Sequence, residues 1–481
     1  PLALTKMPPS TKAYSRLVSE FRKIKIPTFT IPWMRKVFFR GKGHFIAFDS
    51  YANRVANEIF RYGIIQHFYP YYEEDGLSEK WDVAFQHHLG NVADCENMNS
   101  FYKHICKVSN LINDSHLKVF YQYSAYVSYK NRIGMYASTV FPEIETEICD
   151  DNLYVKSVGA SLDSCIKKGD IIIKINNLPT SAIIDEKLSH TSYSSKESGL
   201  YKLTADNSIF KCPVGFGMSK QQVLDSVICL TLHRPGIDTF RVAVHPSSSD
   251  AASFFTSDST LFEMYDDSIC YVNLCGKKRD YKDLVEILPQ LQKSKGIIFD
   301  LRGYPGSMEV GVLAHLADTT VALGNLTKPV MYYPDGKYKQ FVSDTTGWWA
   351  IAPALSSESE SLAKKYQYEI PEKVHLEQPV VFLSDSKAMS FTETVLDMIK
   401  TYHIGTILGE SSAGCNGDIL YCAVPFGDFF MTGYKVANRD GSKHHGIGVL
   451  PDVYVKNECG FDIQKEKAKA YLYEKLGSNH Q

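Results

Sequence analysis

The sequence lacks the patterns that mark metal-binding, nucleic-acid-binding and membrane-spanning proteins. Its 11 cysteines are scattered between Cys95 and Cys459, with no Cys-x-x-Cys pair and no Cys/His cluster at ligand spacing, so we expect no metal site and no cofactor. The odd number leaves at least one thiol free and does not indicate a disulfide framework. No run approaches the roughly 18 apolar residues of a membrane-spanning helix. The formal net charge of -2 supplies no field that would attract nucleic acid or an anionic membrane.

The composition is that of a globular protein with more than one domain. Hydrophobic residues make up 44% of the chain and charged residues 22%, and 481 residues are too many for a single ordinary domain. Residues 1–48 form a basic N-terminal segment. We interpret this segment as a solvated lead-in, with a polyanion-binding arm as the alternative. The sequence starts at Pro1 without a recognisable signal peptide.

Residues 49–136 are assigned to an N-terminal helical unit and the first part of the main domain. Apolar residues at helical spacing predict three helices before residue 113, and β-favouring residues follow from residue 117. Residues 137–246 are predicted to form a small β-domain, because short apolar runs alternate there with turn residues. Within it, the polar stretch 192–217 is predicted to be a long loop.

Residues 247–481 are predicted to form the main α/β core. A strand at 269–274, a helix at 281–291 and a strand at 296–299 alternate, which predicts a largely parallel sheet. The second strand ends in a glycine-rich turn at 300–306, at the sheet edge where α/β proteins form their sites.

A serine at a strand-to-helix junction marks the candidate site. The apolar run 380–383 predicts a buried strand, and an apolar-periodic helix opens around Ser390. A hydroxyl at such a junction is exposed beside the free N–H groups of the helix start, which can stabilise an oxyanion. The alternative is that Ser390 only caps the helix.

Several separated motifs resemble one family, the tail-specific (C-terminal processing) and tricorn-type serine peptidases. The matching motifs, in chain order, are Asn113-Asp114-Ser115-His116, the PDZ-like run 153–177, Asp300-Leu301-Arg302-Gly303-Tyr304-Pro305-Gly306, Ser390-Phe391-Thr392-Glu393, Gly409-Glu410 with Gly414, and Gly448-Val449-Leu450-Pro451-Asp452. The resemblance covers roughly residues 50–456. It implies a ClpP/crotonase-like α/β core with an inserted PDZ-like domain at 137–246, and hydrolysis of polypeptide substrates.

The resemblance also implies roles for individual residues. Ser390 is the expected nucleophile and His116 the expected general base, with Ser115 or a carboxylate orienting the imidazole. The expected oxyanion donors are backbone N–H groups of Phe391 and of Gly303 or Gly306.

The sequence departs from the family pattern at two positions. Cys415 stands where tail-specific members carry the lysine of a Ser-Lys dyad, and His445 stands where tricorn-type members carry an orienting glutamate. Asp440 and Glu410 are alternative orienting groups.

Several residues have simpler interpretations if the resemblance to the family is set aside. His116 is then a loop or capping histidine, Gly303 and Gly306 only form a turn, and Glu393 is a helix-start carboxylate. Cys415 as a nucleophile has no supporting pattern around it. The adjacent pair His444-His445 lacks a third metal ligand.

Three functions follow from these readings. The first is a serine-type endopeptidase acting on unfolded or C-terminally tagged polypeptides that a PDZ-like domain captures. The alternatives are a catalytically inactive peptide-binding protein on the same fold, and acyl chemistry of the crotonase kind. Relatives with this domain order are commonly exported to a bacterial periplasm or cell surface, so we expect the same location here.

Overall fold

The structure is a computed structural model of the 481-residue chain. It describes residues 51–96, 98–120, 142–205, 209–210, 224–247, 260–266, 268–275, 279–306, 308–331, 339–343, 350–366, 370, 372–422, 424 and 426–478. The basic segment 1–48 and the strands expected at 121–141 lie outside these residues.

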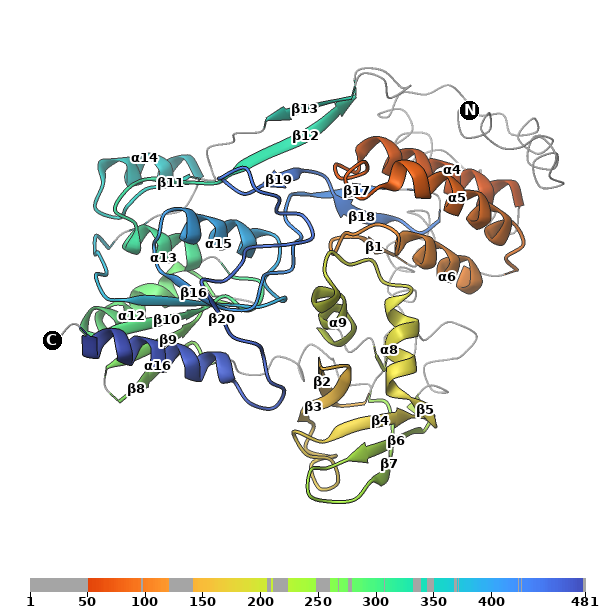
Figure 1. Cartoon of the computed structure of the whole chain (residues 1–481), viewed down its shortest axis with the longest axis horizontal. Helices are drawn as coiled ribbons and strands as arrows, with labels where there is room; N and C mark the ends of the chain where they lie inside the picture. The colour runs from red at the N-terminus through yellow and green to blue at the C-terminus, as the bar shows by residue number, and fades with distance from the viewer. Residues whose placement is uncertain are drawn as a thin grey trace.

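A six-stranded sheet forms the centre of the α/β core, as the βαβ pattern predicts (Figure 1). Its strand order is β20-β16-β15-β10-β9-β8, and all neighbours are parallel except the β8–β9 pair. The strands are β8 (Phe262–Tyr265), β9 (Ile269–Asn273), β10 (Gly296–Asp300), β15 (Val380–Ser384), β16 (Thr406–Gly409) and β20 (Val453–Tyr454).

Helices cover both faces of this sheet because its strands are apolar on both sides. One face packs against α12 (Tyr281–Lys293), α13 (Met308–Leu316) and α15 (Phe391–Thr401). The other face packs against Ala468 and Leu472 of α16 (Ile463–Ser478). Flanking elements are β11 (Val321–Ala322), β12 (Asn325–Met331), β13 (Lys339–Ser343), β14 (Ala350–Ile351), α14 (Ser357–Tyr366) and β19 (Lys435–Ala437).

The three predicted helices are present and pack as a separate layer. They are α4 (Tyr51–Phe68), α5 (Leu77–Ala93) and α6 (Met98–Ser109). Their core continues into a small sheet of β1 (Lys118–Val119), β17 (Ile419–Cys422) and β18 (Phe429–Thr432). Buried Arg61 of α4 donates to the carbonyl oxygens of Phe426 (3.1 Å) and Gly427 (2.6 Å) before β18. The helical unit therefore supports strands that come from the far end of the chain.

The described residues between 142 and 247 form a third unit with its own apolar core, which we call the inserted unit. Its sheet has the order β2-β3-β4-β6-β7, with antiparallel neighbours, and β5 pairs with β4. The elements are β2 (Ile144–Cys149), β3 (Asn152–Val158), β4 (Ile171–Ile175), β5 (Leu178–Pro179), α8 (Thr180–Leu188), α9 (Lys196–Ala205), β6 (Ile228–His233) and β7 (Phe240–Val244).

The helix α9 corrects the sequence analysis, which predicted a loop throughout 192–217. Residues 196–205 are helical, and buried Ser198, Gly199 and Leu203 form the inner face of the helix. A Cβ at Gly199 would lie 2.8 Å from the ring of Tyr193, so the close packing requires glycine. Tertiary packing thus stabilises a helix whose polar sequence shows little amphipathic pattern.

A disulfide joins the inserted unit to the core, although the cysteine count indicated no such framework. Cys149, at the end of β2, bonds to Cys459, which is 310 residues further along. Beside it, the N–H of Gly460 donates to Glu147 of β2 at 2.9 Å. Two cysteines so far apart carry no local spacing signal, so only the fold reveals the pair.

Candidate active site

Ser390 occupies the N-cap position of α15 in a conformation that non-glycine residues rarely adopt. Its φ is 59° and its ψ is -120°. Such a backbone costs about 1–3 kcal/mol and persists only where the surroundings hold it. Here the N–H of Ser390 donates to the carbonyl oxygen of Cys415 at 2.9 Å and to Glu393 Oε2 at 3.2 Å. The strained turn is characteristic of an exposed nucleophile between a strand and a helix.

Glu393 has a larger role than that of a helix-start carboxylate. The side chain is fully buried and accepts hydrogen bonds from the Ser412 hydroxyl (2.6 Å) and from the N–H groups of Gly414 (2.7 Å) and Cys415 (3.0 Å). Its Oε1 also lies 3.4 Å from Nε2 of buried His444. One carboxylate therefore holds the loop 412–415 against the serine turn.

The imidazole of His116 is held through its Nδ1 atom. Nδ1 lies 2.8 Å from the hydroxyl oxygen of Thr432, which in turn lies 2.8 Å from Asp114 Oδ1. Asp114 also accepts from the backbone N–H groups of His116 (2.9 Å) and Thr432 (2.7 Å), as an ionised carboxylate does. Because the Thr432 hydroxyl donates its single hydrogen bond to Asp114, its oxygen accepts the hydrogen bond from the Nδ1–H of His116. The proton of the neutral ring is therefore on Nδ1.

This tautomer leaves a lone pair on Nε2 of His116. Nε2 is buried and has no hydrogen-bond partner among the described residues. Burial lowers the pKa of His116, although the carboxylates of Asp114 and Glu393 act in the opposite direction. The ring is therefore neutral at neutral pH and has the form that a general base requires.

Cys415 contacts both halves of the site. Its carbonyl accepts from the Ser390 N–H, and its Sγ lies 3.2 Å from His116 Nδ1 and 3.3 Å from Asp114 Oδ1. Burial, with the nearby carboxylates of Asp114 and Glu393, raises the pKa of the thiol well above its usual value. Cys415 is thus a neutral thiol, which argues against a nucleophilic role.

The structure places the expected orienting groups away from the imidazole. The hydroxyl of Ser115 is 2.8 Å from the Ser198 hydroxyl and accepts from the Ser194 N–H at 2.9 Å, both in the inserted unit. Asp440 accepts from the Ser442 N–H in an exposed turn. The backbone N–H of Glu410 donates to the carbonyl oxygen of Ser384. The side chain of Glu410 is half-buried, and this burial raises its pKa.

His445 belongs to a separate network behind the histidine loop. Its Nε2 lies 3.0 Å from Asp75, and its ring stacks on Tyr71 with centroids 3.7 Å apart. The residues that hold His116, namely Thr432 and Asp114, were therefore not predicted from the sequence. Asp114 had a local signal, since it precedes His116 by two residues and can bond its N–H. Thr432 had none.

The glycines of the turn 300–306 do not supply free oxyanion donors in this structure. The N–H of Gly303 donates to Leu301 O at 2.9 Å, and that of Gly306 donates to Leu274 O at 3.3 Å. Gly306 is instead needed for packing, because an added Cβ would lie 2.1 Å from the carbonyl oxygen of Arg279. Between them, the N–H of Tyr304 has no acceptor among the described residues.

The atoms around His116 also bear on the question of a metal. In the described part of the chain, Asp114, His116 and Cys415 form the one group whose potential ligand atoms lie close enough for an ion, within 4.8 Å of one another. The Oδ1 atom of Asp114, the Nδ1 atom of His116 and the Sγ atom of Cys415 each already have a hydrogen-bond partner within the group or in Thr432. The contacts support an imidazole-orienting network, and we assign no metal to it.

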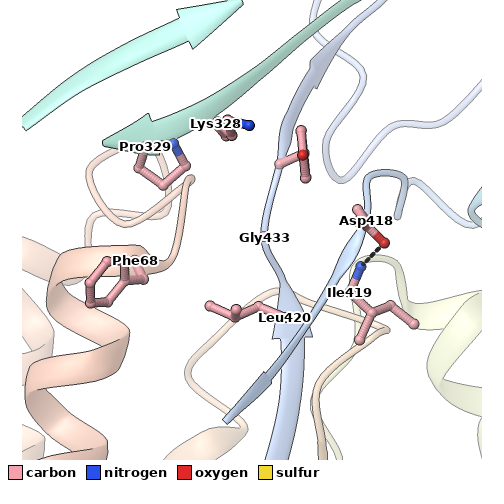
Figure 2. A pocket seen from close by; sticks show the side chains of 8 residues that line it. Phe68, Lys328, Pro329, Asp418, Ile419, Leu420 and Gly433 are labelled. Carbon is pink, nitrogen blue, oxygen red and sulfur yellow. Dashed lines mark hydrogen bonds between the residues drawn. The ribbon is translucent and has the colours of Figure 1, made fainter. Parts of the chain in front are cut away.

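A cavity of about 210 Å³ opens beside this network (Figure 2). Its wall includes Gly433, which directly follows Thr432, and Asp418, whose carbonyl accepts from the Gly433 N–H at 2.7 Å. The remaining lining residues are Phe68, Lys328, Pro329, Ile419, Leu420 and Tyr434. The cavity is thus mostly apolar, with two charged side chains.

A strained serine at the start of α15 and a buried, oriented histidine on an α/β core are the features expected of a serine-type peptidase. Residues 268–455 match the model of peptidase family S41. None of the curated proteins matches the sequence. No helix in the described ranges combines the length and apolarity needed to cross a membrane.

Solved structures share the fold at low sequence identity. The structure of mature CPAF complexed with lactacystin is 13% identical, and the match covers 88% of this chain and 97% of that chain with a TM-score of 0.62. Mature CPAF alone gives 13% identity, 88% and 96% coverage, and a TM-score of 0.60.

Proposed function

We propose that this protein hydrolyses peptide bonds with Ser390 as nucleophile and His116 as general base. The observation that carries the proposal is the state of the imidazole. Its Nδ1–H is held by Thr432 while Nε2 is buried without a partner among the described residues. Cys415, which contacts both Ser390 and His116, brings the two ends of the site together.

In this mechanism Nε2 takes the proton of the Ser390 hydroxyl as its oxygen attacks the peptide carbonyl. The new C–O bond gives a tetrahedral oxyanion, and the C–N bond then breaks as Nε2–H protonates the leaving amine. Water, deprotonated by the same nitrogen, hydrolyses the acyl-enzyme and restores Ser390. Ionised Asp114 stabilises the transient imidazolium through Thr432.

Two backbone N–H groups suit the oxyanion. The N–H of Phe391 is at the start of α15, where the helix dipole also favours negative charge. We assign the second donor to Tyr304 instead of Gly303 or Gly306, because both glycine N–H groups are already used. One such donor contributes about 2.7–4 kcal/mol to transition-state stabilisation.

The polypeptide substrate has two candidate contact regions. The cavity beside Thr432 suits an apolar side chain near the scissile bond, since most of its lining is apolar. The inserted unit has the strand content of a PDZ-like domain, and its terminal strand β2 suits addition of a substrate strand. Helix α9 packs against this strand.

We also propose that the protein works in an oxidising compartment, such as a bacterial periplasm or cell surface. The Cys149–Cys459 disulfide supports this location, because such bonds persist outside the reducing cytosol.

The proposal is tested by labelling with a fluorophosphonate probe and reading the intact mass. We expect one adduct on the wild type, none on Ser390→Ala, and an adduct on the matched control Ser386→Ala. The variant His116→Ala is expected to label far more slowly. The rate of cleavage of an unfolded polypeptide, assayed with the same four proteins, should rank them in the same order as the labelling does.

An absence of both labelling and cleavage between mildly acidic and mildly basic pH would reject the proposal. If Ser390→Ala then still bound peptides as the wild type does, the peptide-binding alternative would hold. Acyl chemistry of the crotonase kind would require turnover of a thioester by the wild type.

A further inference from the structure

The loop that carries His116 is held by the inserted unit. Ser192, between α8 and α9, donates to the carbonyl oxygens of Ile112 and Asp114, the latter at 2.9 Å. Ser115 donates its N–H to the Ser194 hydroxyl at 3.0 Å. The placement of the catalytic base thus depends on side chains outside the α/β core.

Lys202 of α9 contacts the His116 loop through several hydrogen bonds from one ammonium group. Its ammonium group donates to the carbonyl oxygens of Ser115 (3.0 Å), Leu117 (3.3 Å) and Ser192 (2.7 Å). Two of these carbonyls belong to the residues on either side of His116, and the third belongs to the loop that clamps it. An ammonium has three donors, and all three have acceptors here.

A cation suits this position because carbonyl oxygens that converge on one point repel each other. Hydrogen bonds from a charged donor are stronger than hydrogen bonds between neutral groups. Loss of the ammonium would leave the carbonyls at 115 and 117 without their donor, and the peptide units that carry His116 would rotate. A displacement of about 1 Å at a catalytic group can cost on the order of 10²-fold in rate.

We propose that Lys202 is a positioning residue for the catalytic base, holding His116 through the two carbonyl groups that flank it. The inference rests on the proposed function, since it takes His116 as the base of the reaction. It makes α9 of the inserted unit part of the catalytic apparatus.

The ammonium charge of Lys202 also affects the pKa of His116, which a purely structural contact would not do. The groups that act on the imidazole are the carboxylates of Asp114, Glu393 and Asp418 and the ammonium of Lys202, with the neutral thiol of Cys415 in contact. The carboxylates favour the imidazolium and Lys202 opposes it. Removal of Lys202 therefore raises the pKa of His116.

The test compares Lys202→Met with Lys196→Met, a matched control on the same helix. Lys196 is exposed and pairs with Asp151 at 3.1 Å. For Lys202→Met we expect kcat to fall on the order of 10²-fold. KM should change little, because Lys202 contacts the base loop and not the substrate. The acid limb of the kcat/KM profile should move to higher pH. Lys196→Met should retain wild-type kinetics.

A direct titration of His116 by NMR gives a second readout that needs no activity. It is measured in Ser390→Ala and in the double variant with Lys202→Met, or with Lys202→Gln if the Met variant does not fold. An upward shift of the His116 pKa is expected. An unchanged kcat and an unchanged pKa would overturn the role of Lys202.

The two proposals fail in distinguishable ways. If the wild type itself neither labels nor cleaves, the proposed function is wrong, whereas the NMR shift still reports the Lys202 contact. If the wild type is active and Lys202→Met matches it at every pH, only the positioning role is wrong.

Discussion

The Nδ1 atom of His116 lies 2.8 Å from the hydroxyl of Thr432, a residue 316 positions further along the chain. The pairing decides which nitrogen of the ring carries the proton, because the Thr432 hydroxyl donates its own hydrogen bond to Asp114. Thr432 and Asp114 hold the Nδ1 side of the imidazole, whereas His445, where the resemblance led us to expect a glutamate, contacts Asp75.

Replacing Thr432 by valine is expected to lower kcat by about 10²- to 10⁴-fold, the range associated with a misoriented catalytic histidine. Valine keeps the shape but removes the hydroxyl between Nδ1 and Asp114. Thr432→Ser is the matched control and should retain most of the activity, because it keeps that hydroxyl. Peptide cleavage kinetics measure both variants. Equal activity of Thr432→Val and Thr432→Ser would show that the hydroxyl does not orient the ring.

The pH profile of kcat/KM is expected to have its acid limb below about pH 6.5, the ordinary value for histidine. The base acts when neutral, so activity rises as pH increases through the pKa of His116 in the folded protein. Burial lowers this pKa, which moves the limb to the acid side. Initial rates across a pH series measure the limb. A limb above pH 7 would contradict a neutral, buried base.

Replacing Glu393 by glutamine is expected to lower the free energy of unfolding by about 3–5 kcal/mol, the usual cost of breaking a buried ion pair. The change leaves His444 without its anion and weakens the hydrogen bonds to the loop 412–415. Urea denaturation at neutral pH measures the loss. Glu286→Gln, at an exposed position on α12, should shift the value by no more than about 0.5 kcal/mol. Equal stability of the two variants would refute the anchoring role of Glu393.

Removing the Cys149–Cys459 disulfide is expected to destabilise the folded protein by about 2–4 kcal/mol, because the bond closes a loop of 310 residues. The double variant Cys149→Ser/Cys459→Ser should unfold at lower denaturant concentration than the wild type. A reductant should weaken the wild type and leave the double variant unchanged. Cys229→Ser, at an exposed free cysteine, is the control. A wild type that is insensitive to reductant would argue against the bond.

Much of the core could be predicted from the sequence because its signals are local. The apolar run at 380–383 and the run at 296–299 appear as the buried strands β15 and β10, and the helix after Ser390 appears as α15. The hydrophobic periodicity of a strand or a helix depends on a few neighbouring residues, so it can be recognised without tertiary information. The α/β core and the resemblance to tail-specific peptidases followed from such stretches.

The helix α9 and the orienting network could not be predicted in the same way. The residues of α9 are polar and give no clear helical stripe, and the helix is stabilised by packing in the inserted unit. His116 precedes Cys415 by 299 residues and Thr432 by 316 residues, and the pairing of β1 with β18 brings these distant segments together.

The sequence by itself determined the parallel sheet, the serine at a strand-to-helix junction and the motif that contains His116, since each depends on residues close together in the chain. Tertiary structure alone decided which groups act on these residues. Strand pairing brings Thr432 to the imidazole, a buried carboxylate sets its tautomer, and the inserted unit places Lys202 behind it. The physical reason is that hydrogen bonds and charges act over a few ångströms in space, whatever the separation along the chain.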